Sequence, residues 1–291
     1  MARFNRTPST AWGMARRIEE NYARQVQRLT ISIGRRLRRA RTVEEVRRLL
    51  LVISNDPEFN AYCEALAMNM ANRVFRSSEG NWRRAAQEVA HRRGRLIFEE
   101  LQRTFTNTPL GLTVNDIVME NAQLIKTLPS RLDAQLATIM AKESAIAGVR
   151  HETLTKNILD QFFGGLEANE YKARRIARTE TGKAHMALTQ ARAQSLGLNW
   201  YIWRTAQDGD RVRVAHRHME GVLVSYNDPP NPETLADEPG TNGNYHAGCI
   251  FNCRCFAEPI IDLDWIEWPR QVHVSGTIRT MTRAQFNALA A

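Results

Sequence analysis

From about Ser9 to Leu196, apolar residues recur at the three- and four-residue spacing of amphipathic helices, and glycine and proline are sparse. Pro57, Pro109 and Pro129 interrupt this pattern, each at a point where a helix would begin or end. The pattern therefore predicts a long, mainly helical N-terminal part.

Individual helices can be predicted within this part. Thr42 followed by Glu45 forms a capping-box pattern ahead of an apolar stripe, which predicts a helix start. Ser78–Phe105 reads as one long amphipathic helix, and Pro129–Val149 and Asn169–Leu196 are two further helical patterns.

Beyond the last of these helices the pattern changes to short runs rich in aromatic and β-branched residues. Trp200–Trp203, Val212–Val214, Gly221–Val224 and Phe256–Ile261 are typical of strands. Between the last two, Ser225–Asn244 is crowded with Pro, Asn, Asp and Gly, which predicts a long surface loop.

These patterns predict a mainly α protein with a long-helical N-terminal part and a small α+β C-terminal domain. We expect a helical region over 1–168, an α+β domain over 169–261 and a C-terminal tail over 262–291. No repeat of fixed period is present, which argues against a solenoid. No apolar run approaches the roughly 20 residues of a membrane-spanning helix, and the arginine-rich start lacks the apolar core of a secretory signal. We therefore expect no membrane partner.

Composition changes this picture mainly through the placement of charge. The net charge is +9. Residues 1–50 hold 13 Lys/Arg against 4 Asp/Glu, whereas residues 51–150 hold 12 against 11 and residues 151–291 hold 15 against 16. The basic excess thus belongs to the first fifty residues, as expected of an element that contacts nucleic acid or an acidic protein surface.

Seven arginines form the candidate DNA-binding set within this basic segment. They are Arg35, Arg36, Arg38, Arg39, Arg41, Arg47 and Arg48. Guanidinium groups match phosphate oxygens, so this set predicts salt-sensitive, sequence-independent contact with double-stranded DNA. No aromatic residue lies among them, so stacking on single-stranded bases is not predicted. Docking on an acidic protein and a simply solvated helix stay open as alternatives.

Three of the four cysteines crowd together behind the predicted loop, beside a histidine. The candidate metal ligands are His246, Cys249, Cys253 and Cys255. Thiolates and an imidazole are the ligand types that favour zinc, and four of them can close a structural site. The backbone has to fold around the ion at this spacing, and Gly248 and Asn252 would help it to do so. His216 and His218 lie upstream and could replace one of the thiols.

Two alternatives to zinc stay open for this cluster. The cysteines could form a disulfide, or they could be buried thiols that behave as small hydrophobes. Four cysteines are too few for a disulfide scaffold, so we expect synthesis in a reducing cytoplasm.

A second cluster of polar residues pairs Asp208 and Asp210 with His216 and His218. Carboxylates beside histidines could hold a divalent metal for phosphodiester cleavage, which makes a metal-dependent nuclease the alternative function. A turn at Asp208 followed by a solvated face explains the same residues, and no further acid or general base stands at a definable spacing. We therefore predict no catalytic residues. Upstream, Glu180 and the lysine three residues later read as an ordinary helix-surface pair.

In its order of motifs, the segment from Ile176 to Pro259 resembles the Mu F-like family of phage head morphogenesis proteins. The motifs are Ile176-Ala177-Arg178-Thr179-Glu180, Trp203, Asp210-Arg211-Val212-Arg213 with His216 and Gly221, then His246, Asn252-Cys253-Arg254-Cys255 and Pro259. The resemblance implies a minor capsid protein of a tailed phage, bound at the portal vertex with the portal and other head proteins as partners. It implies a location in the virion after synthesis in the bacterial host cytoplasm, and a structural role.

Some members of that family carry a toxin or ADP-ribosyltransferase domain beyond the final cysteines. Only 32 residues follow Pro259 here, so we expect no such domain. A cytoplasmic DNA-binding regulator is disfavoured, because no compact recognition-helix unit precedes the cysteine cluster.

Overall fold

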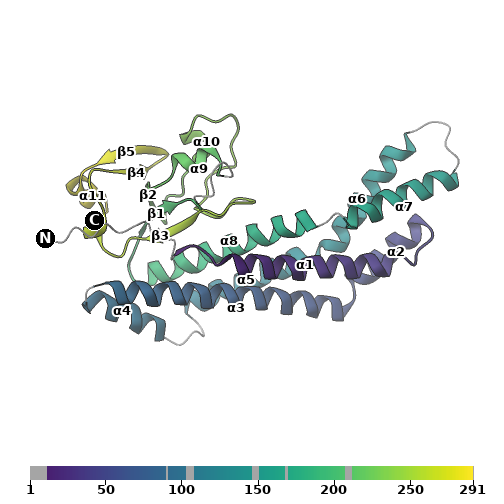
Figure 1. Ribbon diagram of the computed structural model, residues 1–291, viewed down its shortest axis with the longest axis horizontal. Helices are drawn as coiled ribbons and strands as arrows, with labels where there is room; N and C mark the ends of the chain where they lie inside the picture. Colours follow the sequence, from purple (N-terminus) through teal and green to yellow (C-terminus); the bar gives the residue numbers. More distant parts are fainter. Residues whose placement is uncertain are drawn as a thin grey trace. The chain divides into compact units, whose positions relative to one another are not determined.

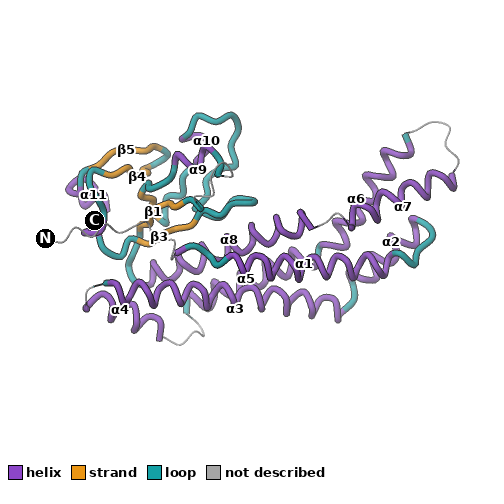
Figure 2. Tube along the Cα trace, viewed as in Figure 1, coloured by secondary structure: helices purple, strands orange, loops and turns teal. Residues whose placement is uncertain are grey.

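The computed structural model describes residues 12–89, 91–102, 108–145, 151–167, 170–206 and 212–290 (Figure 1). Helices dominate as far as Ser195 and a small sheet follows, which confirms the mainly α class with a small α+β region (Figure 2). The helices are α1 (Arg16–Leu37), α2 (Val43–Ser54), α3 (Pro57–Glu88), α4 (His91–Gln102), α5 (Pro109–Lys126), α6 (Leu128–Ser144), α7 (His151–Glu167), α8 (Glu170–Ser195), α9 (Val214–His218), α10 (Pro232–Leu235) and α11 (Arg283–Ala290). The strands are β1 (Trp200–Arg204), β2 (Leu223–Ser225), β3 (Phe256–Pro259), β4 (Arg270–Val274) and β5 (Thr277–Met281).

The chain divides into two compact units. The sheet unit comprises residues 1–15, 72–114 and 178–291, and the helical unit comprises residues 16–71 and 115–177. Residues 262–291, set apart above as a tail, supply β4, β5 and α11 within the sheet unit. Among the described residues, no helix is both long enough and apolar enough to cross a membrane.

The helical unit buries one face of each of its helices. Apolar side chains of α1 are buried at helical spacing along its whole length, from Ile18 to Leu37. Helix α2 packs against α6, and α1 and α6 each pack against α7. The predicted capping box is confirmed, because Thr42 accepts a hydrogen bond from the Glu45 amide and the Glu45 carboxylate accepts from the Thr42 amide.

The sheet unit is built on a five-stranded sheet in the order β3-β1-β2-β4-β5. Strand β1 pairs antiparallel with β2 and β3, β2 pairs parallel with β4, and β4 pairs antiparallel with β5. Alternation along β1 sends Tyr201 and Trp203 into one core cluster and Trp200 and Ile202 against another. The first of these clusters also contains Tyr245, Cys253 and Cys255, which belong to the candidate site.

Two predictions of secondary structure are corrected. The single helix expected over Ser78–Phe105 is interrupted, since α3 ends at Glu88 and α4 begins at His91. Val89, just after α3, and Ile97 of α4 belong to the same core cluster. The strand expected over Val212–Val214 is absent, and the chain forms α9 from Val214 onward.

The reason for α9 is burial rather than propensity. Ala215, His216 and Met219 are buried at helical spacing on one face of this short helix, whereas His218 is exposed. The loop predicted over Ser225–Asn244 also contains one short helix, α10.

Candidate functional site

A histidine and two cysteines meet in the core of the sheet unit. The His216 Nδ1 atom lies 3.5 Å from the Cys253 Sγ atom and 3.4 Å from the Cys255 Sγ atom. The ligand atoms of these three residues all lie within 4.8 Å of one another. His216 comes from α9, and the two cysteines immediately precede β3. The three side chains are 2%, 5% and 7% exposed, so they face each other away from bulk water.

The orientation of the His216 ring is set from its other nitrogen. Its Nε2 atom lies 3.0 Å from the Tyr245 hydroxyl oxygen, and that hydroxyl donates to the Glu233 Oε1 atom at 2.7 Å. Because the tyrosine proton is used on Glu233, the hydroxyl oxygen accepts from the His216 Nε2–H group. This tautomer leaves a lone pair on Nδ1, directed at the two sulfurs.

Glu233 is held in its ionised form at the end of this chain of hydrogen bonds. Burial raises the pKa of the Glu233 carboxyl, but hydrogen bonds from Tyr245 and Asn242 outweigh that effect and the net pKa is lowered. The Asn242 amide donates to the Glu233 Oε1 atom at 2.8 Å. The loop that carries Glu233, Asn242 and Tyr245 therefore orients the His216 ring through hydrogen bonds at Nε2, the nitrogen that does not face the cysteines.

The backbone around the cysteines adopts the bends that the sequence predicted. Gly248 has φ = 85° and Asn252 has φ = 57°, both in the left-handed region. A Cβ atom on Gly248 would lie 2.7 Å from the Cys255 carbonyl oxygen, and one on Gly182 would lie 2.7 Å from the Gly248 carbonyl oxygen. The close approach of α8 to this loop thus depends on two glycines.

Helix α8 makes further contacts with the same loop. The Arg178 Nη1 atom donates to the Asn252 Oδ1 atom at 2.6 Å, and the Asn252 amide donates to the Thr179 hydroxyl at 3.0 Å. Apart from the family motif over Ile176–Glu180, no pattern in the sequence points to these contacts, because residues more than 70 positions apart leave no periodic signal. Glu180, three residues before Lys183, does form the predicted surface ion pair at 3.3 Å.

The other two predicted metal ligands lie elsewhere in the same core. The His246 Nδ1 atom lies 3.2 Å from the Tyr201 hydroxyl, and burial lowers the pKa of the His246 imidazole. Burial raises the pKa of the Cys249 thiol to about 12. Of the four predicted ligands, the structure groups Cys253 and Cys255 with His216. The described residues include all four cysteines of the chain, and each is a free thiol.

The two clustered thiols are electrostatically unequal. The hydrogen bond from Cys255 is the largest influence on Cys253 and lowers the pKa of the Cys253 thiol despite its burial. The hydrogen bond to Cys253 and burial both raise the pKa of Cys255. The Cys253 sulfur also accepts a hydrogen bond from the Cys255 amide at 3.3 Å. Of the two thiols, Cys253 is therefore the one that loses its proton more readily.

The residues of the nuclease alternative are only partly described. Asp208 and Asp210 lie outside the described residues, as does the turn predicted there. His216 is buried and bonded as above, whereas His218 is exposed on the other side of α9. The two histidines therefore do not share a site.

The seven arginines of the basic segment lie at the end of α1, in the following turn and in α2, and all seven are exposed. Two of them are held by acids of the helical unit. The Arg47 guanidinium makes a two-point contact with Asp133 at 2.8 and 3.1 Å, and Arg36 lies 3.4 Å from Asp56. Asp133 raises the pKa of Arg47 through its hydrogen bond and its charge.

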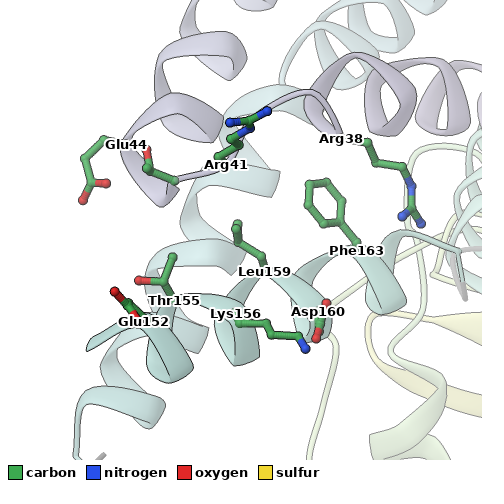
Figure 3. Close-up of a pocket in the computed structure, with 10 residues that line it drawn as sticks. Arg38, Arg41, Glu44, Glu152, Thr155, Lys156, Leu159, Asp160 and Phe163 are labelled. Atoms are coloured by element: carbon green, nitrogen blue, oxygen red, sulfur yellow. The ribbon is translucent and has the colours of Figure 1, made fainter. Parts of the chain in front are cut away.

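A surface pocket of about 630 Å³ adjoins this arginine segment. Figure 3 shows Arg38 and Arg41 on one side and the side chains of α7 on the other. The Arg38 guanidinium carbon lies 5.2 Å from the centre of the Phe163 ring, an arrangement typical of a cation–π contact. The remaining lining residues are Thr42, Glu44, Glu152, Thr155, Lys156, Leu159 and Asp160. The pocket carries both signs of charge, so it is not a simple anion site.

Comparison with known proteins matches part of the chain. Residues 138–258 match the family model described as "Phage Mu protein F like protein", which confirms the resemblance found in the sequence. An uncharacterized protein of Haemophilus influenzae (strain ATCC 51907 / DSM 11121 / KW20 / Rd) is 34% identical over 150 residues, covering 51% of this chain and 30% of that protein. The chain thus spans less than a third of the length of this relative. No solved structure matches the chain.

Proposed function

We propose that this chain, whose residues 138–258 match the model of the Phage Mu protein F-like family, is a minor capsid protein of a tailed phage. It acts in head morphogenesis, is made in the host cytoplasm and becomes part of the virion at the portal vertex. Its role is structural rather than catalytic.

The family match carries this proposal, and three structural features support it. The matched segment contains the contacts of α8 with the cysteine loop, so the family motifs form one packed element. His216, the residue with the most potential for catalysis, is buried with its ring nitrogens directed at Tyr245 and the cysteines. A long helical unit with an exposed charged surface also suits docking to other head proteins.

The test is to locate the protein during assembly. Procapsids and mature heads would be purified from infected or induced cells, and the chain would be quantified by immunoblot against the major capsid protein. We expect a few copies per particle and co-purification with portal assemblies. Absence from both procapsids and mature heads would overturn the proposal, and its presence without portal association would overturn the portal location.

As a finer part of the same proposal, the basic segment contacts packaged double-stranded DNA. All seven arginines are exposed, and guanidinium groups bind phosphates without regard to sequence. Arg36, Arg38 and Arg47 make contacts within the helical unit, so substituting them risks disturbing the fold. The other four arginines are better targets for a test.

The test variant replaces these four arginines with glutamine. They are Arg35, Arg39, Arg41 and Arg48. The matched control replaces four exposed basic residues elsewhere, namely Arg131, Lys142, Arg217 and Arg279, and so removes the same charge. Binding to a short duplex would be followed by fluorescence anisotropy at several salt concentrations.

We expect the test variant to lose at least about tenfold in affinity and to shift the salt slope by about 1 for each phosphate contact removed. The control should retain most of the affinity. Equal loss in both variants would show that net charge alone is responsible and would overturn a DNA contact at the basic segment.

A further inference from the structure

We propose that His216, Cys253 and Cys255 are the protein ligands of a structural zinc ion. This inference differs from the ligand set that the spacing predicts, because it replaces His246 and Cys249 with His216. It does not depend on the role in head assembly.

The geometry of the three ligand atoms fits the ion. With zinc–sulfur bonds of about 2.3 Å and zinc–nitrogen bonds of about 2.0 Å, tetrahedral angles place sulfur and nitrogen ligands about 3.5 Å apart. The two observed Nδ1–Sγ distances are 3.5 and 3.4 Å. The two nitrogen–sulfur distances therefore already match the edges of a zinc tetrahedron, and the two sulfurs lie within 4.8 Å of each other.

The protonation pattern fits as well. The Tyr245 hydroxyl donates to Glu233 and accepts from the His216 Nε2–H group, so the Nδ1 lone pair faces the sulfurs. Both sulfurs lie almost equally near this one lone pair. A cation between the three atoms satisfies all of them at once. The chain from His216 through Tyr245 to Glu233 is the kind of hydrogen-bonded support that orients histidine ligands of zinc.

The donor set favours zinc among the common metals. Two thiolates with one imidazole are soft to borderline ligands, unlike the carboxylate and carbonyl oxygens that magnesium and calcium prefer. The amide of Cys255, 3.3 Å from the Cys253 sulfur, further stabilises a thiolate there. Cys249 is outside the group whose ligand atoms lie within 4.8 Å, so it is not a ligand in this arrangement.

The position of the site indicates what the ion does. It joins α9, a helix of only five residues, to the segment that leads into β3. So short a helix is unstable alone. Because the ion would link two segments more than 35 residues apart in sequence, its binding free energy would contribute directly to the stability of the sheet unit.

The first experiment measures metal content in the full chain, expressed with zinc supplied and purified in reducing buffer without chelator. We expect about one zinc per chain by elemental mass spectrometry. Replacement by cobalt should give the near-ultraviolet absorption of thiolate-to-cobalt charge transfer. A chain without zinc that also gives no such band when cobalt is added would overturn the proposal.

Variants then distinguish the two ligand sets. His216→Ala, Cys253→Ser and Cys255→Ser should each lose the metal, whereas His246→Gln and Cys249→Ser should keep it. Loss of metal in the last two with retention in His216→Ala would overturn the present set in favour of the one predicted from spacing. Tryptophan fluorescence and near-ultraviolet circular dichroism would show whether each variant is folded.

A measurement on the unmodified chain covers the case in which a variant fails to fold. Cys253 and Cys255 should resist alkylation by iodoacetamide until a chelator is added, while the labelling of Cys63, in the helical unit, should not change. A peptide carrying a Cys253–Cys255 disulfide in freshly purified reduced protein would overturn the proposal. So would alkylation of Cys253 at the same rate with and without chelator.

Discussion

In the sheet unit, the side chains best suited to chemistry or metal binding are buried. His216, Cys253 and Cys255 are each less than a tenth exposed, and the His216 ring is held by Tyr245. In the helical unit, the side chains best suited to binding a partner are arginines on the surface, and water can solvate all of them. A buried polar group has to find its partner within the protein, so its geometry is specified by many distant residues. An exposed charge needs no such partner.

This difference predicts how the two units respond to substitution. Changes near the buried cluster should act individually and strongly, because each removes a defined contact or creates a clash. Changes among the exposed arginines should act through the number of charges removed. The arginine surface is therefore expected to tolerate single losses that the cysteine cluster does not.

The chain offers a probe that separates the units. All six tryptophans lie in the residues of the sheet unit, and the helical unit has none. Intrinsic fluorescence therefore reports unfolding of the sheet unit, whereas far-ultraviolet circular dichroism is weighted toward the helices. The following predictions are ordered from the largest expected effect to the smallest.

The largest expected effect is a loss of stability at low pH caused by His185 in α8. This side chain is 3% exposed, and burial lowers its pKa from 6.5 to about 4. Between these values the unfolded chain binds a proton that the folded chain does not, so the stabilising contribution is complete above pH 6.5 and is lost as the pH falls toward 4. The loss should be on the order of 3 kcal/mol. Urea unfolding followed by tryptophan fluorescence at pH 7 and near pH 4 would measure it.

The control for this prediction is His185→Gln, which cannot gain the proton. We expect the wild type to lose more stability than this variant as the pH falls. Parallel pH profiles for the two proteins would show that His185 is not responsible.

The next effect concerns the glycine beside the cysteines. In Gly248→Ala the new Cβ would lie 2.7 Å from the Cys255 carbonyl oxygen, in a residue with φ = 85°. The matched control, Gly240→Ala, has φ = 88° but nothing within 4 Å of the new Cβ. The control should lose about 1 kcal/mol from backbone strain alone, and Gly248→Ala about 2 kcal/mol more. Equal losses in fluorescence-monitored unfolding would mean that the loop moves aside without cost.

The smallest effect belongs to the helical unit. Thr42→Ala removes the side chain that caps α2 beside the arginine-rich turn, which should cost about 1 kcal/mol. Thr42→Ser keeps the hydroxyl and should restore most of this loss. The change should appear in the circular dichroism signal more than in tryptophan fluorescence. A larger shift in fluorescence than in circular dichroism would contradict the assignment of Thr42 to a separate helical unit.

Most of the regular structure could be predicted from sequence because it depends on local periodicity. The helical N-terminal part, the capping box at Thr42, and the strands beginning near Trp200 and Phe256 all follow from the spacing of apolar residues or from neighbouring residues. The prediction from sequence was wrong over Val212–Val214, where the expected strand is absent and Val214 begins α9. The helix forms there because it buries Ala215 and His216 in a core that distant segments of the chain supply.

Prediction from local sequence patterns reaches the same limit at the cysteine cluster. By itself, the sequence determined that Cys253 and Cys255 stand together, that Gly248 and Asn252 bend the chain near them, and that the arginines concentrate in the first fifty residues. Only the tertiary structure decided that His216, 37 residues before Cys253, faces these sulfurs, while His246, 7 residues before Cys253, bonds to Tyr201. The physical reason is that spacing along the chain determines only local geometry. Which side chains meet in a core is determined by the packing of α8, α9 and β1, which no short motif encodes.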